Sequence, residues 1–376
     1  MIKDEIKYLV FSDVHFGHNK TPTEFIINNL NNLLLNYKDR KDIKIIFIAG
    51  DLFDRLLVYP NNIVSEITIW VSRLLEFCVE KNIILRILEG TPSHDWKQSK
   101  CIIDIAKILK LPVDVDYITT LKIETIEHLN LTILYIPDEY KPDSNQTYSE
   151  VLDLMKSLNL NKIDIGIFHG QFKYQLPFND KNNVCHNEEN YLAIIKHFIN
   201  IGHIHNFSTY NRIIAQGSVD RIRHDEEAPK GMVECVIRPD MNDRYYFIEN
   251  KNAKVYKTIE IKTNNLDKAI NQIKKTLSKI PIDSFIRIKT KKNNPAYLGL
   301  NEIKKLFPMY SFSRKAIDEE AEIEKQKLIE NENNVYTPID INKENIEQLL
   351  LDVITKKYEL TDKQLGIFKN LFGENR

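Results

Sequence analysis

The chain has 376 residues, of which 43% are hydrophobic and 28% are charged. This composition is typical of folded globular proteins and excludes a disordered chain, and the length predicts two or three domains. No apolar run in the sequence approaches the roughly 18 residues that span a bilayer, and the charged residues 1–8 do not form a signal peptide. We therefore expect a cytoplasmic protein that is not bound to a membrane.

The formal net charge of −1 is the sum of three segments that differ in sign. Residues 1–250 carry 28 basic and 35 acidic side chains (−7), residues 251–315 carry 16 and 4 (+12), and residues 316–376 carry 8 and 14 (−6). A nearly neutral chain can therefore still contain one segment that attracts a polyanion. We predict one domain for each of these three segments.

Short apolar segments alternate with longer amphipathic ones up to about residue 216, a pattern that predicts an α/β layered domain. The apolar segments contain few polar residues, as expected for strands covered on both faces. Six such strands are predicted, at residues 7–12, 44–49, 83–88, 132–136, 164–169 and 198–202.

Two of the amphipathic segments have clear helical features. Residues Thr21-Pro22-Thr23-Glu24 have the pattern of a capping box with proline in the first turn, which predicts a helix beginning there. A longer helix is predicted at 60–81. Its spacing of apolar residues creates one buried face, formed by Ile63, Ile67, Trp70, Val71, Leu74, Leu75 and Cys78.

The pattern changes after residue 230. Runs rich in β-forming residues continue to about residue 261 and predict a hairpin-like edge to the main sheet. The basic segment that follows predicts a smaller α/β unit, and the acidic segment is predicted to be helical. In the smaller unit we expect a helix at 266–278, a strand at 285–289 and a helix at 300–307.

Residues capable of chemistry cluster directly after the predicted strands. Open α/β sheets bind ligands at the carboxyl ends of their strands, and a glycine there lets the backbone turn sharply and approach the ligand. In chain order the clusters are Asp13-Val14-His15, Gly50-Asp51-Leu52-Phe53-Asp54, Gly90-Thr91-Pro92-Ser93-His94-Asp95, His169-Gly170 and Gly202-His203-Ile204-His205.

These clusters predict a site for two metal ions. In an extended segment, alternate residues point to the same side, so Asp-x-His and Gly-His-x-His each direct two ligands toward one place. Five strand ends supply more oxygen and nitrogen ligands than one tetrahedral metal site can hold. Because none of these ligands is a thiolate, the set suits manganese, iron or magnesium. Each pattern alone is common: Asp54 could instead cap a helix, and His169 could be a core histidine with satisfied hydrogen bonds.

The order of the clusters resembles the motifs D-x-H, G-D-x-x-D, G-N-H-D, a lone H and G-H-x-H of the calcineurin-like metallophosphoesterases. The chain is most similar to the SbcD-type DNA-repair nucleases, because Gly217-Ser218-Val219-Asp220-Arg221 matches their turn into β-rich sequence, here 230–234. The resemblance covers residues 7–250 by motif and the remainder by layout. It implies a two-sheet α/β sandwich, a smaller α/β capping domain and a helical carboxy-terminal segment.

The resemblance also implies the roles of the site residues. One ion would be held by Asp13, His15 and His205, the second by His169 and His203, and Asp51 would bridge them. Both ions are expected to be Mn²⁺, with Mg²⁺ or Fe²⁺ as alternatives, and they would activate water and neutralise charge on the phosphoryl group.

Three further roles concern the residues after the third strand. By the same resemblance, His94 would be the catalytic histidine that protonates the leaving oxygen or stabilises the transition state, and Asp95 would orient it. The family's asparagine ligand is replaced here. Ser93 stands at that position, directly before His94, and its neutral hydroxyl is a poorer ligand than an amide oxygen.

The basic segment points to the substrate. Its concentration of positive charge is suited to DNA, and in SbcD-type nucleases the corresponding unit caps the active site and holds DNA. The alternative is a solvated charged surface. The residues predicted to contact DNA are Arg287, Lys289, Lys291 and Lys292, with Arg221 as a further phosphate contact unless it pairs with a nearby carboxylate.

By resemblance, the chain is expected to be the catalytic subunit of an SbcCD-like complex. The helical tail would dock on an SbcC-type coiled-coil ATPase, unless it packs against its own body, and the chain would form a homodimer. Two other functions stay open. One is a metallophosphoesterase that acts on nucleotides or phosphoproteins, and the other is a DNA-end-binding scaffold of weak activity.

Overall fold

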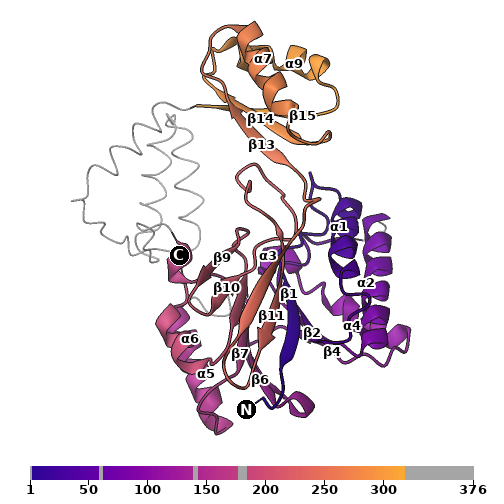
Figure 1. Cartoon of the computed structure of the whole chain (residues 1–376), viewed down its shortest axis with the longest axis vertical. Helices are drawn as coiled ribbons and strands as arrows, with labels where there is room; N and C mark the ends of the chain where they lie inside the picture. The colour runs from indigo at the N-terminus through magenta and orange to yellow at the C-terminus, as the bar shows by residue number, and fades with distance from the viewer. Residues whose placement is uncertain (1, 59–61, 139–142, 177–183, 318–376) are drawn as a thin grey trace, which may run out of the picture. The chain divides into compact units, whose positions relative to one another are not determined.

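The structure is a computed structural model, and it describes residues 2–58, 62–138, 143–176 and 184–317. Its larger part contains two six-stranded sheets with helices on their outer faces, and a three-stranded sheet follows (Figure 1). The predicted two-sheet α/β sandwich is confirmed. Residues 318–376, which contain most of the predicted helical acidic tail, lie outside the described residues.

The first sheet has the strand order β12-β11-β1-β2-β3-β4. Strands β1 to β4 run parallel, and the hairpin of β11 and β12 adds antiparallel beside β1. The predicted hairpin-like edge is therefore part of this sheet. The strands are β1 (Ile6–Phe11), β2 (Ile43–Ala49), β3 (Ile84–Leu88), β4 (Val115–Ile118), β11 (Gly231–Ile237) and β12 (Arg244–Glu249).

The second sheet has the order β5-β6-β7-β8-β10-β9. Its four inner strands run parallel, and β5 and β9 are antiparallel edges. The six strands predicted from apolar runs are all present with ends within a residue of expectation. Strands of this sheet are β5 (Lys122–Ile126), β6 (Leu131–Ile136), β7 (Ile165–His169), β8 (Ile199–Gly202), β9 (Ser208–Tyr210) and β10 (Ile213–Ala215).

Three layers of apolar side chains hold this architecture together. One layer lies between the two sheets, where Phe47 of β2 packs against Tyr135 of β6. The outer layers lie beneath helices α1 (Thr23–Leu35), α2 (Asn62–Lys81) and α4 (Lys100–Ile108) on the first sheet and α5 (Ser144–Ser157) and α6 (Glu188–Ile194) on the second. Six residues of the predicted apolar face of α2 are buried, and Ile63 is half-buried.

The predicted capping box at the start of α1 is wrong. Pro22 is the residue before the helix, and no side chain caps it. The hydroxyl of Thr21 instead donates to the carbonyl of Arg221, and that of Thr23 accepts a hydrogen bond from the amide of Gly17. The hydroxyl of Thr21, which the local pattern assigned to the helix terminus, thus has a partner in a distant part of the chain.

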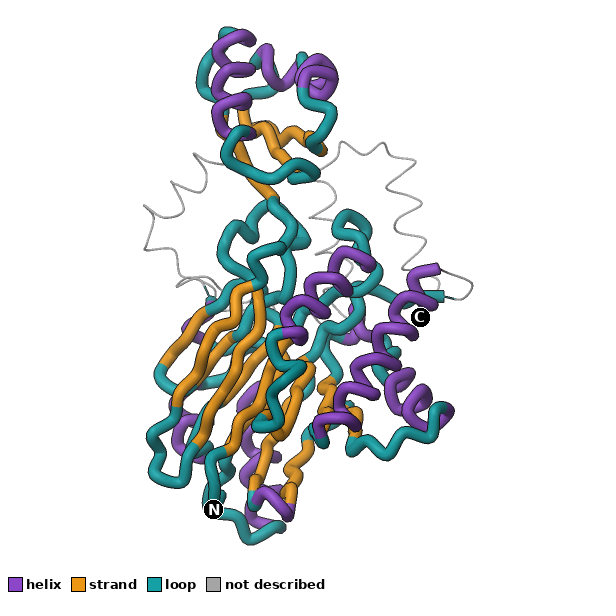
Figure 2. The backbone as a smooth tube through the Cα atoms, turned by 45° about the vertical axis from the view of Figure 1, so that its right-hand side comes forward, coloured by secondary structure: helices purple, strands orange, loops and turns teal. Residues whose placement is uncertain are grey.

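The basic segment folds around a core of its own. Strands β13 (Tyr256–Glu260), β14 (Phe285–Thr290) and β15 (Ser311–Ala316) form a parallel sheet, which Figure 2 shows beside its helices. Helices α7 (Leu266–Leu277), α8 (Pro295–Leu298) and α9 (Leu300–Leu306) pack on one face of it. Strand β13 was expected in the hairpin region but pairs with β14. No helix among the described residues is long and apolar enough to cross a membrane.

Candidate metal centre

Five strand ends from both large sheets carry the residues predicted to bind metal. Asp13 and His15 follow β1, Asp51 follows β2, Ser93 follows β3, His169 ends β7, and His203 and His205 follow β8. The carboxyl ends of parallel strands share one edge of a sheet. Residues separated by up to about 190 positions in the sequence are therefore brought together.

The loops after β1 and β2 are tied to each other by backbone hydrogen bonds. The amide of Asp13 donates to the carbonyl of Gly50 (3.1 Å), and that of Val14 donates to the carbonyl of Asp51 (2.8 Å). The ligand residues adopt left-handed backbone conformations that cost free energy and are maintained by such surroundings. Their φ angles are 52° at Asp13, 56° at His15, 51° at Asp51 and 95° at His203.

Close packing at the strand ends explains two of the glycines. A Cβ atom on Gly50 would lie 2.2 Å from Nδ1 of His169, and φ at Gly50 is +85°. A Cβ atom on Gly202 would lie 2.3 Å from the carbonyl oxygen of Ala49. Side chains here would push the two sheets apart, so the ligands approach one another only because these positions are glycine.

The predicted ligands form three overlapping groups, in each of which the ligand atoms lie within 4.8 Å of one another. Asp51 belongs to two of the groups, and His15 to two. This arrangement matches the geometry needed for ions that share a carboxylate. The groups are Asp13 with His15 and His205, His15 with Asp51 and His94, and Asp51 with His169 and His203.

The hydrogen bonds of His205 direct its free lone pair into the first group. Its Nδ1 atom donates to Oε1 of Glu226 (2.6 Å), so Nε2 carries no proton in the neutral ring. This Nε2 atom lies 3.1 Å from Nε2 of His15 and 3.7 Å from Oδ1 of Asp13. One ligand atom from each of the three side chains thus reaches the same place, where a cation could bind all three.

His169 provides the same evidence in the third group. Its Nδ1 atom donates to the carbonyl of Ala49 (2.7 Å), and its Nε2 atom makes no hydrogen bond within the described part of the chain but lies 3.3 Å from Oδ1 of Asp51. Burial disfavours protonation of His169, yet the Asp51 carboxylate raises the pKa of this ring well above its usual range. A divalent cation bound at Nε2 would compete with that proton. The donor set therefore fits metal ions.

His94 lies at the exposed rim of the cluster, with 37% of its side chain accessible. Its Nδ1 atom donates to Oδ2 of Asp51 (3.1 Å), and this hydrogen bond raises the pKa of His94. Since Nδ1 is engaged, Nε2 is the ring atom that a substrate can reach. This position agrees with a group that contacts substrate.

Asp95 does not orient His94 in the way that was expected. Its carboxylate accepts hydrogen bonds from the backbone amides of Asp51 (3.0 Å), Phe53 (2.9 Å) and Gly90 (2.8 Å). Residues 94 and 95 are consecutive on the short helix α3 (Pro92–Asp95), so their side chains point in different directions. Burial and the charge of Asp51 raise the pKa of Asp95 to about 7. Asp95 fixes the loop that presents Asp51.

The hydroxyl nearest the second group belongs to Thr91 and not to Ser93. Ser93 is exposed, whereas Oγ1 of Thr91 lies 3.3 Å from Oδ2 of Asp51 and 3.3 Å from Nδ1 of His203. The amide of Thr91 also donates to Oδ1 of Asp51 (2.7 Å). The loop is two residues longer than the family motif, so counting back from His94 led to the exposed Ser93, while the hydroxyl closest to Asp51 and His203 belongs to Thr91.

Two carboxylates support the ligands from outside the groups. Asp54 lies with Oδ1 3.4 Å from Nδ1 of His15, and Glu226 binds His205 as described above. Asp54 belongs to one of the predicted metal-binding clusters, with helix capping as the alternative, whereas Glu226 was expected at most to pair with a nearby arginine. The second D of G-D-x-x-D was the available signal for Asp54, while no sequence signal connects Glu226 to His205.

The predicted DNA contacts lie in two environments. Arg221 donates to the carbonyls of Ala253, Lys254 and Glu227, so it joins backbone segments and does not present its charge freely. Arg287 and Lys289 alternate along β14 with Ile286 and Ile288, and hence lie on the sheet face opposite the helices. Lys291 and Lys292 are exposed in the turn that follows β14.

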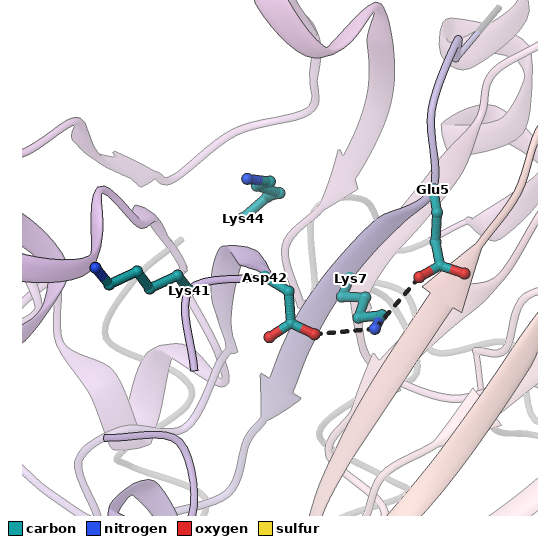
Figure 3. A pocket seen from close by; sticks show the side chains of 5 residues that line it. All are labelled: Glu5, Lys7, Lys41, Asp42 and Lys44. Atoms are coloured by element: carbon teal, nitrogen blue, oxygen red, sulfur yellow. Dashed lines mark hydrogen bonds and ion pairs between the residues drawn. The ribbon is translucent and has the colours of Figure 1, made fainter. Parts of the chain in front are cut away.

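A separate hollow of about 450 Å³ lies at the other end of the first sheet, near the amino-terminal ends of β1 and β2 (Figure 3). It is lined by Glu5, Lys7, Lys41, Asp42 and Lys44. Lys7 forms ion pairs with both Asp42 (2.9 Å) and Glu5 (3.3 Å), so its charge is already balanced. This hollow is not part of the metal centre.

Comparison with known proteins assigns no family. No protein-family model and no curated protein matches the chain. Solved structures with partial similarity include TT1561 of Thermus thermophilus (10% identity, TM-score 0.38, covering 66% of this chain and 99% of that one). GAP50, the anchor in the inner membrane complex of Plasmodium, gives 14% identity, a TM-score of 0.38 and coverages of 67% and 87%. These values assign no activity.

Proposed function

We propose that this protein is a two-metal phosphodiesterase that cleaves DNA, of the SbcD type within the calcineurin-like metallophosphoesterases. The proposal depends above all on one observation: five strand ends bring the His and Asp ligand atoms into three overlapping groups, two of which share Asp51. The order of the motifs in the sequence and the convergence of their side chains in space point to the same site. Their agreement supports a metal-dependent hydrolase.

The first ion would be held by Asp13, His15 and His205, and the second by His169 and His203, with Asp51 between them. Nitrogen and carboxylate oxygen donors without a thiolate favour Mn²⁺, and Mg²⁺ or Fe²⁺ are alternatives. When bound, such ions lower the pKa of water and offset the negative charge that develops on a phosphoryl group.

The residues of the chain supply the remaining functions. His94 would donate a proton from Nε2 to the leaving oxygen, since Asp51 engages Nδ1 and favours the protonated ring. Thr91 would provide the neutral oxygen near the second ion, the position for which Ser93 was expected. Asp95 would maintain the loop around Asp51.

DNA is proposed as substrate because the +12 segment places basic side chains on the face of its sheet that its helices do not cover. Arg287 pairs in register with Ser313, and Lys289 with Lys315, so these residues share one face. On the same face, Ser313 lies 3.5 Å from Nε2 of His224, which belongs to the large domain. His224 precedes Glu226, the partner of ligand His205, by two residues. A polyanion on this face would approach the metal centre.

Digestion of linear DNA with added Mn²⁺ tests the proposal. A nuclease shortens DNA, and its activity is abolished by a chelator and restored by Mn²⁺. A phosphoesterase of another class would hydrolyse only small phosphoesters, and a scaffold would bind DNA ends but cleave neither. Either of these outcomes would overturn the proposal.

The partner prediction extends this proposal to residues 316–376. We infer that this acidic segment docks on an SbcC-type coiled-coil ATPase and that the catalytic subunit acts as a homodimer. The segment's apolar residues, among them Leu349, Leu350 and Val353, support the inference by their spacing. Affinity capture of a large coiled-coil ATPase by the full chain, lost when residues 346–376 are deleted, is the expected result.

A further inference from the structure

Glu226 is a buried carboxylate that directly contacts a predicted metal ligand. Only 2% of its surface is accessible, and its Oε1 atom accepts the hydrogen bond from Nδ1 of His205 at 2.6 Å. A buried charge is costly unless it is paired and hydrogen-bonded. The sequence places Glu226 in an acidic run, 225–227, where nothing distinguishes it from its neighbours.

The surroundings of Glu226 fix its position from several sides. Its Oε2 atom accepts a hydrogen bond from the amide of Ile222 (3.2 Å) and lies 3.3 Å from Nζ of Lys230. Arg223 approaches Oε1 at 3.0 Å. The side chain of Lys230 is fully buried, and Nζ also donates to the backbone carbonyl of His205 (2.7 Å). Lys230 thus holds both the carboxylate and the backbone of the residue that the carboxylate contacts.

This arrangement determines which nitrogen of His205 can bind a metal. With the proton on Nδ1 committed to Glu226, the lone pair is on Nε2, which faces Asp13 and His15. A carboxylate behind a ligating histidine fixes its tautomer and ring orientation and increases its basicity. The Nδ1 atom of His169 instead donates to the backbone carbonyl of Ala49, so a neutral group fixes the tautomer and orientation of that ring.

We propose that Glu226 is a positioning residue for His205, and that Lys230 holds Glu226 in place for this role. The inference rests on the proposed two-metal function. It predicts that loss of the carboxylate lowers the affinity for the first ion, which Asp13, His15 and His205 would hold. The affinity for the second ion should change little. A purely structural role, in which Glu226 only neutralises Lys230, predicts lower stability with unchanged metal binding.

The test measures Mn²⁺ binding to the full chain by titration calorimetry and by electron paramagnetic resonance. Glu226→Gln should lower the affinity for one of the two Mn²⁺ ions by about 10- to 100-fold, the usual effect of removing such a hydrogen-bond partner. The spectrum of a coupled Mn²⁺ pair should be replaced by that of isolated Mn²⁺. Glu226→Asp should restore part of the affinity, since it retains the charge.

Glu227→Gln is the matched control, because it makes the same change one residue away. The Glu227 carboxylate instead pairs with Lys257 and accepts a hydrogen bond from the amide of Thr258. Its substitution should leave Mn²⁺ binding unchanged. Thermal unfolding of the metal-free proteins separates the effect on folding from the effect on the ion.

If Glu226→Gln leaves Lys230 unpaired and the chain unfolds, Glu226→Gln combined with Lys230→Met removes the buried charge. A folded double variant that binds both ions as tightly as the wild type overturns the inference, as does Glu226→Gln with unchanged affinity. Failure of the wild type to bind Mn²⁺ overturns the two-metal proposal together with this one. If the wild type binds two ions and cleaves DNA, and Glu226→Gln binds Mn²⁺ as tightly as the wild type, only the positioning role of Glu226 is rejected.

Discussion

Thr91 offers the sharpest test of the metal centre, because the sequence pointed to Ser93 and the structure points to Thr91. Replacing Thr91 by Val removes the hydroxyl and nearly preserves the shape of the side chain. The lost oxygen lies 3.3 Å from both Asp51 Oδ2 and His203 Nδ1, and Thr91 is only 8% exposed. The backbone hydrogen bond from Thr91 to Asp51 should remain.

The expected magnitude follows from the charged partner. A hydrogen bond to a charged group contributes about 1.5–3 kcal/mol, and each 1.4 kcal/mol is about tenfold in an equilibrium constant. Thr91→Val should therefore lower the affinity for the second Mn²⁺ ion by roughly 10- to 100-fold. DNA cleavage should fall when the Mn²⁺ concentration is limiting. Saturating Mn²⁺ should restore most of that cleavage.

Ser93→Ala is the matched control, since Ser93 is exposed and exposed substitutions usually change stability by less than about 0.5 kcal/mol. Calorimetric titration with Mn²⁺ measures both variants on the same scale. The reasoning is refuted if Ser93→Ala weakens the second ion while Thr91→Val does not. Equal effects of both would show that neither hydroxyl has a specific role.

Three further predictions concern catalysis, substrate and pH. His94→Ala should abolish cleavage of linear DNA while Mn²⁺ content and DNA binding persist, and unchanged cleavage would remove its assigned role. Replacing Lys289, Lys291 and Lys292 by Gln should weaken DNA binding and flatten its salt dependence, because each lost phosphate contact lowers the slope by about 0.9; an unaltered slope would mean that DNA binds elsewhere. Burial raises the pKa of Asp220 to about 6 from a usual 3.8, so the folded chain retains a proton there that the unfolded chain has lost. The protonated Asp220 therefore contributes fully to the free energy of unfolding below about pH 4. This contribution, up to about 3 kcal/mol, is lost as pH rises through 6. Chemical denaturation across this range should show the loss in the wild type and not in Asp220→Asn.

Much of the fold could be predicted because its information is local. The six strands that were predicted are continuous apolar runs, and their burial between two layers requires that composition. Short or edge strands escaped prediction: β4, β5, β9 and β10 have three to five residues each, and their pattern is weak. The capping box failed because Thr21 found a tertiary partner in Arg221.

The sequence alone identified most of the strand-end residues whose side chains converge in the candidate metal centre. Asp13 with His15 and His203 with His205 are pairs two residues apart, so each pair follows the end of one strand and reaches the same region, although the backbone at Asp13, His15 and His203 is left-handed and not extended as expected. The tertiary structure decided the contacts between segments. It places the hydroxyl of Thr91 near His203, gives Asp95 a backbone amide as partner, and pairs Glu226 with His205. These contacts join residues far apart in the chain, and they depend on how the two sheets pack, which no local pattern encodes.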